Sequence, residues 1–425
     1  MSQPPESSII PAKKRLKKRV NVRRPDVMAL VEDEVRDHYR SSIVERIRAH
    51  GGVLAIGNTT VRLAKQFGFC YGVERAIDLS YAARRVFPTN RIFLIGEIIH
   101  NPEVNRQLVE MGITSLDWEN LTQEYEDLGE EDVVIVPAFG TSMPFMNKLQ
   151  ERGVYVIDTT CGDVMSVWKR VKNNAKGGYT SIIHGKKGHE ETLATASRAL
   201  GTDGTGHYLV LLTLAECDLV CDYIRNGGDK QAFLTRFAEA YSPGFDPDVH
   251  LVKVGLANQT TMLESETEEI QRRVKNAIVA RYGQEEIADH YQSFDTICGA
   301  TQERQDALYE MLREKMDLLL VVGGYNSSNT THLVEIGEKE LPSFFIRSAS
   351  CLQSFERIVH YDLEQQTEVE AYSQKFNQLD RAMVVGITAG ASCPNNLIEA
   401  TVLRIFELRG IDREGVVAAL PPVTS

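Results

Sequence analysis

The sequence has no cysteine pair of the common metal or redox spacing, no long apolar run and no excess of basic residues. Its seven cysteines include no C-x-x-C pair, which argues against a zinc ribbon and a thioredoxin motif. Apolar runs are short, such as residues 318–322, whereas a membrane-spanning helix needs about 20 apolar residues. Basic residues number 47 against 59 acidic ones, for a net charge of −12. A nucleic-acid binder needs a basic surface, so we expect neither nucleic acid nor a membrane as partner.

The composition is that of a globular protein, with 43% hydrophobic and 25% charged residues in a chain of 425. The odd number of cysteines and the lack of a visible signal peptide favour a reducing compartment. We therefore expect a cytoplasmic protein, or one of the plastid stroma if the source is a photosynthetic eukaryote.

The beginning of the chain differs from the rest. Residues 1–25 are basic and contain Pro and Ser, which favours a solvated tail over a nucleic-acid or targeting arm. Residues 26–50 are predicted to be helical and to end at Gly51-Gly52.

Three cysteines, Cys70, Cys161 and Cys298, occur in the same local pattern. Each lies between a predicted strand (61–66, 154–157, 294–297) and a predicted helix (72–85, 164–176, 300–316). A helix N-terminus favours thiolate, the form that iron binds. A single cysteine of this kind is most often a small buried residue, but three equivalent ones indicate a shared site. The remaining cysteines, at 217, 221, 351 and 393, are predicted to be core or connecting residues.

Other predicted strands also end in polar segments. These segments follow the strands over 91–95, 132–136, 180–183, 251–257, 318–322 and 383–387. In open α/β sheets, ligands bind at the carboxyl ends of the strands. The pattern predicts an α/β fold of several parallel βαβ units that share one central site.

Two of these segments have the composition of an anion site. Residues 323–330 (GGYNSSNT) and 388–394 (TAGASCP) combine glycines, hydroxyls and amides with the start of a helix. Ordinary helix capping explains one hydroxyl but not four consecutive polar residues. His100 and His189 are candidate donors to phosphate oxygens. Glu191 is a candidate proton donor, although a first-turn helix Glu is the simpler local interpretation.

Eight ordered motifs resemble one family, 4-hydroxy-3-methylbut-2-enyl diphosphate reductase in its longer, cyanobacterial or plastid form. The last enzyme of the methylerythritol phosphate route to isoprenoids belongs to this family. The resemblance extends from about residue 26 to 410. The motifs are FCxGVERA (69–76), EIIHN (97–101), DTTC (158–161), HEET (189–192), NQTT (258–261), TICxATxxRQ (296–305), NSSN (326–329) and TAGAS (388–392).

The resemblance implies three similar parallel α/β domains in a pseudo-threefold arrangement around a [4Fe–4S] cluster. The expected boundaries are 59–160, 161–297 with an insertion near 225–250, and 298–410. They follow a helical extension over 26–58 and precede a C-terminal tail over 411–425. The first strand of the 59–160 domain is a candidate member of the third domain.

The resemblance also implies the chemistry. Cys70, Cys161 and Cys298 would ligate three irons, and the fourth iron would be open to the substrate. Two electrons would remove the substrate hydroxyl as water and yield isopentenyl and dimethylallyl diphosphates. A ferredoxin or flavodoxin is the expected electron donor.

The remaining site residues are assigned by the same motifs. Glu191 would be the proton donor with Thr260 beside it. The residues expected at the diphosphate substrate are His100, His189, Thr261, Thr301, Ser327, Ser328, Asn329 and Ser392.

Two positions depart from the family pattern. The compact form has an Ala-His-Gly motif with another diphosphate histidine, where this chain has Ala138-Phe139-Gly140. Gly162-Asp163 follows Cys161, where Pro and an apolar residue are usual. Asp163 is expected either to point outward as a helix cap or to alter docking of the electron donor.

Three alternatives stay open. Another [4Fe–4S] enzyme with an open iron, such as a hydro-lyase or a quinolinate synthase-like protein, would need carboxylate-binding arginines. A non-catalytic redox sensor is supported only by the basic segment at the N-terminus. Zinc is the simpler metal, but it commonly draws two ligands from one short spaced pair.

Overall fold

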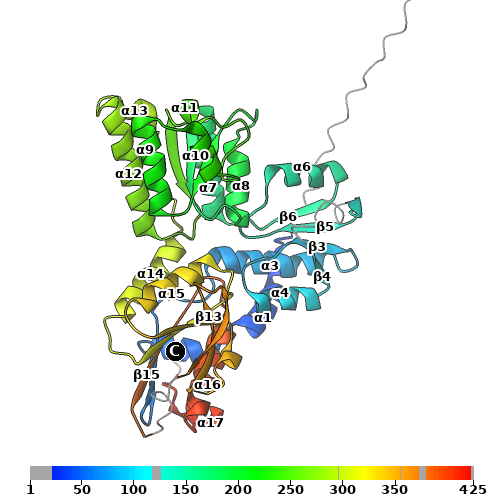
Figure 1. Cartoon of the computed structure of the whole chain (residues 1–425). Helices are drawn as coiled ribbons and strands as arrows, with labels where there is room; N and C mark the ends of the chain where they lie inside the picture. Colours follow the sequence, from blue (N-terminus) through cyan, green and yellow to red (C-terminus); the bar gives the residue numbers. More distant parts are fainter. Residues whose placement is uncertain (1–21, 117–125, 295, 355, 373–379, 423–425) are drawn as a thin grey trace, which may run out of the picture.

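The structure is a computed structural model, and it describes residues 22–116, 126–294, 296–354, 356–372 and 380–422. Most of the tail expected over 1–25 therefore lies outside the described residues. Within them, the strands form three mainly parallel sheets and a separate two-stranded hairpin. Figure 1 shows the three sheets with their helices as a right-hand unit (cyan), an upper unit (green) and a lower unit (yellow to red). The predicted α/β fold class is confirmed.

The right-hand sheet has the strand order β4-β3-β5-β6, and all its neighbours are parallel. The four residues of β5 are all buried, as expected for a parallel strand covered on both faces. Asn101 caps α4, and Pro102 occupies its first turn. The unit comprises α3 (Tyr71–Val86), β3 (Ile92–Ile95), α4 (Pro102–Glu110), β4 (Ile113–Leu116), β5 (Val133–Val136), α6 (Met143–Arg152) and β6 (Tyr155–Asp158).

The upper sheet has the order β10-β9-β7-β8 and is also parallel. Cys217 and Cys221 lie in α9 with their sulfurs 3.8 Å apart, and both are buried, as the sequence predicts. The unit comprises α7 (Gly162–Lys176), β7 (Thr180–His184), α8 (Glu190–Ala199), β8 (Tyr208–Leu211), α9 (Leu214–Asn226), α10 (Lys230–Arg236), α11 (Pro247–His250), β9 (Val254–Asn258), α12 (Glu264–Tyr282), α13 (Ile287–His290) and β10 (Tyr291–Gln292).

The lower sheet has the order β1-β2-β15-β11-β12, so it combines two strands from early in the sequence with three from the last third. β2 pairs in parallel with β15, whereas β1 and β2 form an antiparallel pair. The unit comprises β1 (Val53–Ile56), β2 (Thr59–Leu63), α14 (Gly299–Met311), β11 (Leu318–Val322), α15 (Ser328–Glu338), β12 (Ser343–Ile346), η1 (Ala349–Cys351), β15 (Met383–Ala389), α16 (Asn395–Leu408) and α17 (Arg413–Ala419), together with the hairpin of β13 (Arg357–Asp362) and β14 (Thr367–Tyr372).

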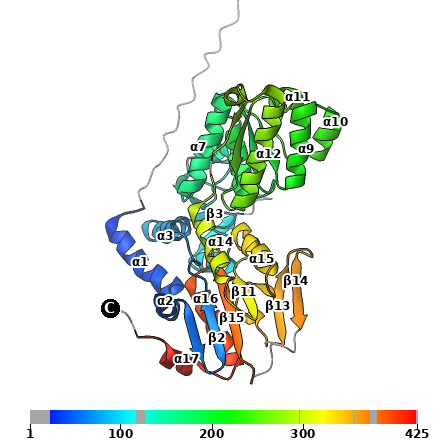
Figure 2. The same ribbon diagram turned by 90° about the vertical axis from the view of Figure 1, so that its left-hand side faces the viewer.

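The helical stretch predicted over 26–50 is two helices, α1 (Pro25–Tyr39) and α2 (Ser42–Ala49). The chain breaks between them because the Ser41 hydroxyl accepts a hydrogen bond from the Val44 N–H and so starts a new helix. We call residues 22–50 the N-terminal extension. Figure 2 shows α1 beside α3 and α2 beside the lower sheet, so the extension joins two of the units.

The three cysteines occupy the N-cap positions of α3, α7 and α14. The strand predicted over 294–297 is wrong for residues 294, 296 and 297, because β10 ends at Gln292, and residue 295 lies outside the described residues. Beyond it the chain leaves the sheet, and the Cys298 N–H donates to the Thr260 carbonyl oxygen, 3.1 Å away. The strand predicted over 61–66 likewise ends at Leu63. The length of chain between strand and cysteine therefore differs among the three units.

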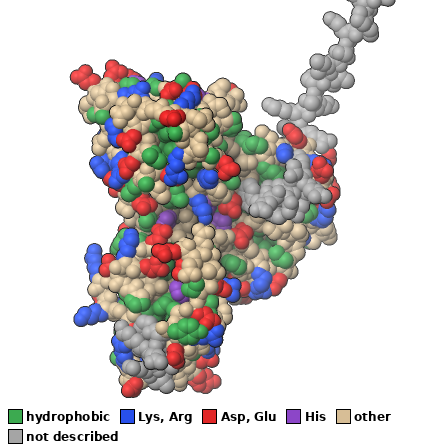
Figure 3. Space-filling view, in the orientation of Figure 1, with side chains coloured by type: hydrophobic (Ala, Val, Ile, Leu, Met, Phe, Trp, Pro, Cys, Tyr) green, Lys and Arg blue, Asp and Glu red, His purple; other side chains and the backbone are tan. Residues whose placement is uncertain are grey.

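On the face drawn in Figure 3, neither sign of charge dominates. Figure 3 shows Lys and Arg side chains interspersed with Asp and Glu over the face in view, and histidines between the upper and lower units. Among the described helices, none is both long and apolar enough to cross a membrane.

Candidate functional site

The carboxyl ends of strands from all three sheets meet at one pocket of about 120 Å³, which we call the central pocket. Every residue that the sequence assigned to the site lines it. These are Cys70, His100, Cys161, His189, Glu191, Thr260, Thr261, Cys298, Thr301, Ser327, Ser328, Asn329 and Ser392. The structure therefore brings the predicted residues together from positions up to about 300 residues apart, while their individual roles stay predictions.

Gly72 shows how closely two of the thiols approach. A Cβ atom at this position would lie 2.6 Å from Cys161 Sγ and 3.9 Å from Cys70 Sγ. Only glycine leaves this space open between the two sulfurs. Three cysteine sulfurs that face one pocket are the donor set of an iron–sulfur cluster, so these residues fit such a group.

The thiols are not made acidic by their helix positions alone. Burial raises the pKa of Cys161, and it raises the pKa of Cys298 to about 12, with a hydrogen bond to Asp163 adding to the effect. The backbone N–H groups at the two helix starts do lower the pKa of these thiols, as expected, but burial outweighs them and the net shift is upward. A metal that binds here must displace the thiol protons.

Asp163 does not cap a helix, and the expectation that it points outward is wrong. Cys161 is the N-cap of α7, and Asp163 lies in the first turn. Its carboxylate lines the central pocket and accepts a hydrogen bond from the Cys298 thiol, with 3.0 Å between S and O.

Glu191 is buried in the first turn of α8, with 3% of its surface exposed. Its two carboxyl oxygens accept hydrogen bonds from the Thr260 N–H (2.7 Å) and hydroxyl (3.0 Å). Burial raises the pKa of Glu191 to about 7, although both Thr260 contacts oppose the shift. A carboxyl group with this pKa can hold and release a proton near neutral pH.

His189 is the N-cap of α8, and its Nδ1 accepts a hydrogen bond from the Glu191 N–H at 3.1 Å. Burial lowers the pKa of His189 to about 3, so the ring is neutral. With Nδ1 accepting, the proton is on Nε2, which becomes a donor. His100, His189 and Glu190 are close enough to hold a metal ion, but a donor Nε2 on His189 suits an anion better.

Phe139, where the compact form has histidine, stacks on His100 and meets His189 edge-on. The ring centroids of Phe139 and His100 are 4.8 Å apart, with 12° between the planes. The Phe139 and His189 centroids are 6.2 Å apart. Phe139 therefore adds no phosphate donor but packs against both predicted ones.

The hydroxyl and amide groups around the α15 N-terminus form a second cluster of donors. Ser327 caps α15, and its hydroxyl lies 3.4 Å from that of Ser392. The Asn329 Oδ1 accepts from the Ala391 N–H, but its buried Nδ2 has no hydrogen-bond partner among the described residues. An unpaired buried donor is costly, which indicates that a ligand accepts from it.

Sequence reasoning missed Arg304 and Gln259. Arg304 is buried in α14 and donates to the Gly68 carbonyl oxygen (2.6 Å), which ties the Cys70 loop to the Cys298 helix. Gln259 contacts the hydroxyls of Thr192, Thr261 and Ser328. Both residues are in quoted motifs, Arg304 in TICxATxxRQ and Gln259 in NQTT, and their places in these motifs are the signal that could have been used.

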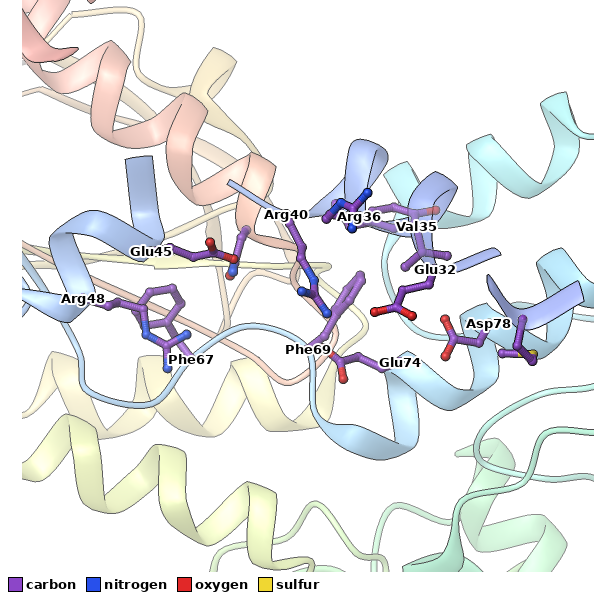
Figure 4. A pocket seen from close by; sticks show the side chains of 13 residues that line it. Glu32, Val35, Arg36, Arg40, Glu45, Arg48, Phe67, Phe69, Glu74 and Asp78 are labelled. Carbon is purple, nitrogen blue, oxygen red and sulfur yellow. The ribbon is translucent and has the colours of Figure 1, made fainter. Parts of the chain in front are cut away.

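A larger cavity, of about 390 Å³, lies between the N-terminal extension and α3. We call it the extension cavity. Figure 4 shows Glu32, Glu74 and Asp78 gathered at one end, Arg48 and Glu45 at the other, and Arg40 between them. Charges of both signs are mixed along its wall, and none of the predicted site residues line it.

Comparisons with known proteins agree with this geometry. The family model described as LytB protein matches residues 61–406. The 4-hydroxy-3-methylbut-2-enyl diphosphate reductase of Gloeobacter violaceus is 48% identical, covering 93% of this chain and 94% of its own. The enzyme of the same name from Thermosynechococcus vestitus is 47% identical, covering 90% and 92%.

Solved structures show the same fold. One is described as (E)-4-hydroxy-3-methyl-but-2-enyl diphosphate reductase, the terminal enzyme of the non-mevalonate pathway. It is 25% identical with a TM-score of 0.51, covering 82% of this chain and 99% of its own. The reductase from Plasmodium falciparum, at 23% identity and a TM-score of 0.58, covers 80% and 86% and supports the fold alone. The resemblance predicted from the motifs is confirmed, and this chain belongs to the LytB family, whose curated relatives are named 4-hydroxy-3-methylbut-2-enyl diphosphate reductase.

Proposed function

We propose that this chain reduces (E)-4-hydroxy-3-methylbut-2-enyl diphosphate to isopentenyl and dimethylallyl diphosphates. The reaction takes up two electrons and two protons, breaks the C4–O bond and releases the hydroxyl as water. The observation that carries the proposal is that three thiols, a protonatable carboxyl and a set of phosphate donors line one pocket.

Cys70, Cys161 and Cys298 would hold a [4Fe–4S] cluster. When bound, the cluster supplies the electrons and a Lewis-acidic iron for the substrate hydroxyl, because three cysteine ligands leave one iron open. Arg304, beside Cys70 and Cys298, adds a positive charge near two of the sulfurs.

The diphosphate would lie at the start of α15. Ser327, Ser328 and Asn329 bring hydroxyls, an unpaired amide and the positive end of an eleven-residue helix to the same place. The Nε2–H of His189 adds a neutral donor from α8. Thr261, Thr301 and Ser392 line the same pocket.

Glu191 would deliver the proton. Its raised pKa keeps it protonated up to about pH 7, and its contacts with Thr260 hold both oxygens in place. Water is restricted here because Glu191 and Thr260 are both buried. A buried carboxyl group of this kind serves as a general acid.

The pocket lining argues against the alternatives. Neither Arg nor Lys is among the described residues that line the central pocket, so a carboxylate-binding hydro-lyase lacks its usual anchor. A redox sensor has no use for a buried acid beside phosphate donors. The proposed electron donor is a ferredoxin- or flavodoxin-type protein.

The test is anaerobic purification with iron and sulfide analysis, followed by turnover of the C5 hydroxy-diphosphate with a low-potential reductant. We expect about four irons and four sulfides per chain, and loss of turnover in Cys298→Ala. An iron-free protein after anaerobic reconstitution, or zinc in place of iron, would contradict the proposal.

A further inference from the structure

His100 is held by contacts that the proposed function does not use. It lies at the end of the loop after β3, and its Nδ1 is 3.0 Å from the Glu97 Oε2. The Asn326 Nδ2 donates to the same carboxylate oxygen at 2.8 Å and lies 3.2 Å from His100 Nδ1. A carboxylate only accepts, so His100 Nδ1 carries a hydrogen and Glu97 receives two donors.

The ring plane of His100 is held by a different residue. Phe139 stacks on it with 12° between the planes, and His189 meets it at 82° with the centroids 5.1 Å apart. Glu97 therefore determines which nitrogen faces the pocket, and Phe139 determines the plane in which that nitrogen lies. Aromatic contacts of this kind have preferred geometries and restrict ring rotation.

The other nitrogen of His100 has no hydrogen-bond partner among the described residues. This Nε2 is buried, since only 11% of the side chain is exposed, and the residue lines the central pocket. The Glu190 Oε2 lies 3.7 Å from it, beyond hydrogen-bond distance. The orphaned nitrogen is thus directed at the place where the diphosphate would lie.

We propose that Glu97 and Phe139 are positioning residues that make His100 the main charged donor to the diphosphate. The proposal rests on the proposed function, because it takes the central pocket as the diphosphate site. With Nδ1–H given to Glu97, Nε2 can donate to a phosphate oxygen only when both nitrogens are protonated. Glu97 stabilises that imidazolium from the side opposite the ligand, as a carboxylate does for a metal-bound histidine.

The other charged groups near His100 do not replace Glu97. Glu190 lies on the side of Nε2, 3.7 Å from it, where its negative charge would repel a bound anion. Glu191 is engaged by Thr260, and His189 is neutral. Phe139 stands where the compact form has a third histidine donor. It gives no hydrogen bond to the diphosphate, but its stacking on His100 restricts the orientation of the His100 ring. Glu97 is therefore the one carboxylate placed to keep His100 charged once the diphosphate is bound.

The test measures inorganic pyrophosphate binding to the iron-loaded protein by calorimetry. Glu97→Gln keeps the size of the side chain and removes its charge, and we expect affinity to fall on the order of 10- to 100-fold. Phe139→Leu should reduce it roughly 2- to 10-fold. Glu110→Gln is the matched control, because Glu110 is an exposed residue paired with Arg106, and it should bind like the unchanged chain.

A spectroscopic measurement separates positioning from a structural effect. The ¹⁵N spectrum of histidine-labelled protein, with His100 assigned from a His100→Asn variant, should show a doubly protonated ring in the pyrophosphate complex. Glu97→Gln should leave this ring neutral, with iron content unchanged and with KM raised more than kcat lowered. Glu97→Asp should restore part of the affinity.

The outcomes distinguish the two proposals. If pyrophosphate binds Glu97→Gln and the unchanged chain equally, or if His100 is neutral in both complexes, the positioning role is overturned and the proposed function stands. If the unchanged, iron-loaded chain binds no pyrophosphate, the assignment of the central pocket fails together with the positioning role.

Discussion

The central pocket and the extension cavity share the segment around Cys70 but differ in what faces them. Cys70 and Val73 line the central pocket, whereas Phe69 and Glu74 line the extension cavity. The extension cavity has about three times the volume, with opposite charges mixed along its wall. The central pocket is smaller, and thiols, an orphaned imidazole nitrogen and an unpaired amide converge on it.

Each region also contains a carboxyl group whose pKa is raised. Burial raises the pKa of Glu191 in the central pocket, and burial together with Glu74 raises that of Asp78 beside the extension cavity. A raised pKa therefore does not identify a site by itself. The two regions differ because thiols and buried polar atoms without a hydrogen-bond partner among the described residues gather only at the central pocket. The following predictions test this difference.

The largest effect is expected from the cysteines. Cys298→Ala removes one of three thiols that meet at the central pocket, so we expect loss of bound iron and of turnover. Cys217→Ala is the matched control, because Cys217 is a buried cysteine of α9 that faces only the core. Iron and sulfide analysis after anaerobic reconstitution compares the two variants. Equal iron content in both would show that Cys298 is no more important for iron binding than a core cysteine.

Gly72→Ala should be nearly as severe. Its new methyl group would lie 2.6 Å from Cys161 Sγ, so one of the two must move and the sulfurs no longer face a common centre. Gly162→Ala and Gly299→Ala are matched controls, because each follows a site cysteine and neither Cβ meets an atom within 4 Å. We expect most of the iron to be lost in the first variant and retained in the others, as measured by visible absorption.

Glu191→Gln should lower kcat roughly 10²- to 10⁴-fold, the usual range for loss of a general acid. Because the protonated form is the active one, the rate of the unchanged chain should fall as pH rises through about 7. Asp78→Asn should leave both the rate and its pH profile unchanged. Steady-state rates between pH 6 and 9 test this, and a flat profile for the unchanged chain would argue against Glu191 as the acid.

The smallest effect concerns stability against pH. The folded protein keeps the Glu191 proton up to about pH 7, whereas the unfolded chain loses it near pH 4.5, so folding stability should decline as pH rises between these values. Glu191→Gln should therefore raise the free energy of unfolding at pH 8 by up to roughly 3 kcal/mol. Asp78→Asn should act in the same direction and by less, because Asp78 is only partly buried and solvent screens its charge.

Urea unfolding of the iron-loaded proteins at pH 5 and pH 8 measures both changes. The gain from Glu191→Gln should be much smaller at pH 5 than at pH 8. At pH 5, just above the unfolded pKa of 4.5, loss of the Glu191 proton stabilises the unfolded chain only slightly, whereas at pH 8 it does so strongly. A Glu191→Gln gain of the same size at both pH values would indicate a packing effect instead.

Local sequence predicted much of this molecule because its signals are local. Buried parallel strands such as β11 are continuous apolar runs, and Cys70 and Cys161 precede helices with clear apolar periodicity, α3 and α7. The strand before Cys298 was predicted wrongly because the described residues there contact side chains of other elements, as Phe294 does with Gln271 and Thr296 with Asn258, rather than pairing with a strand. The residue pattern of such a short segment does not indicate contacts with residues that are distant in the chain.

The sequence by itself determined the α/β class, the family and most of the polar residues that line the central pocket. Only the tertiary structure decided how those residues act on each other. Burial reversed the expected acidity of Cys298. Contacts between units brought the Asp163 carboxylate to the Cys298 thiol, and contacts within the right-hand unit placed Phe139 and Glu97 against the His100 ring. The physical reason is that desolvation and contacts across sheets depend on neighbours distant in the chain, which local residue patterns do not contain.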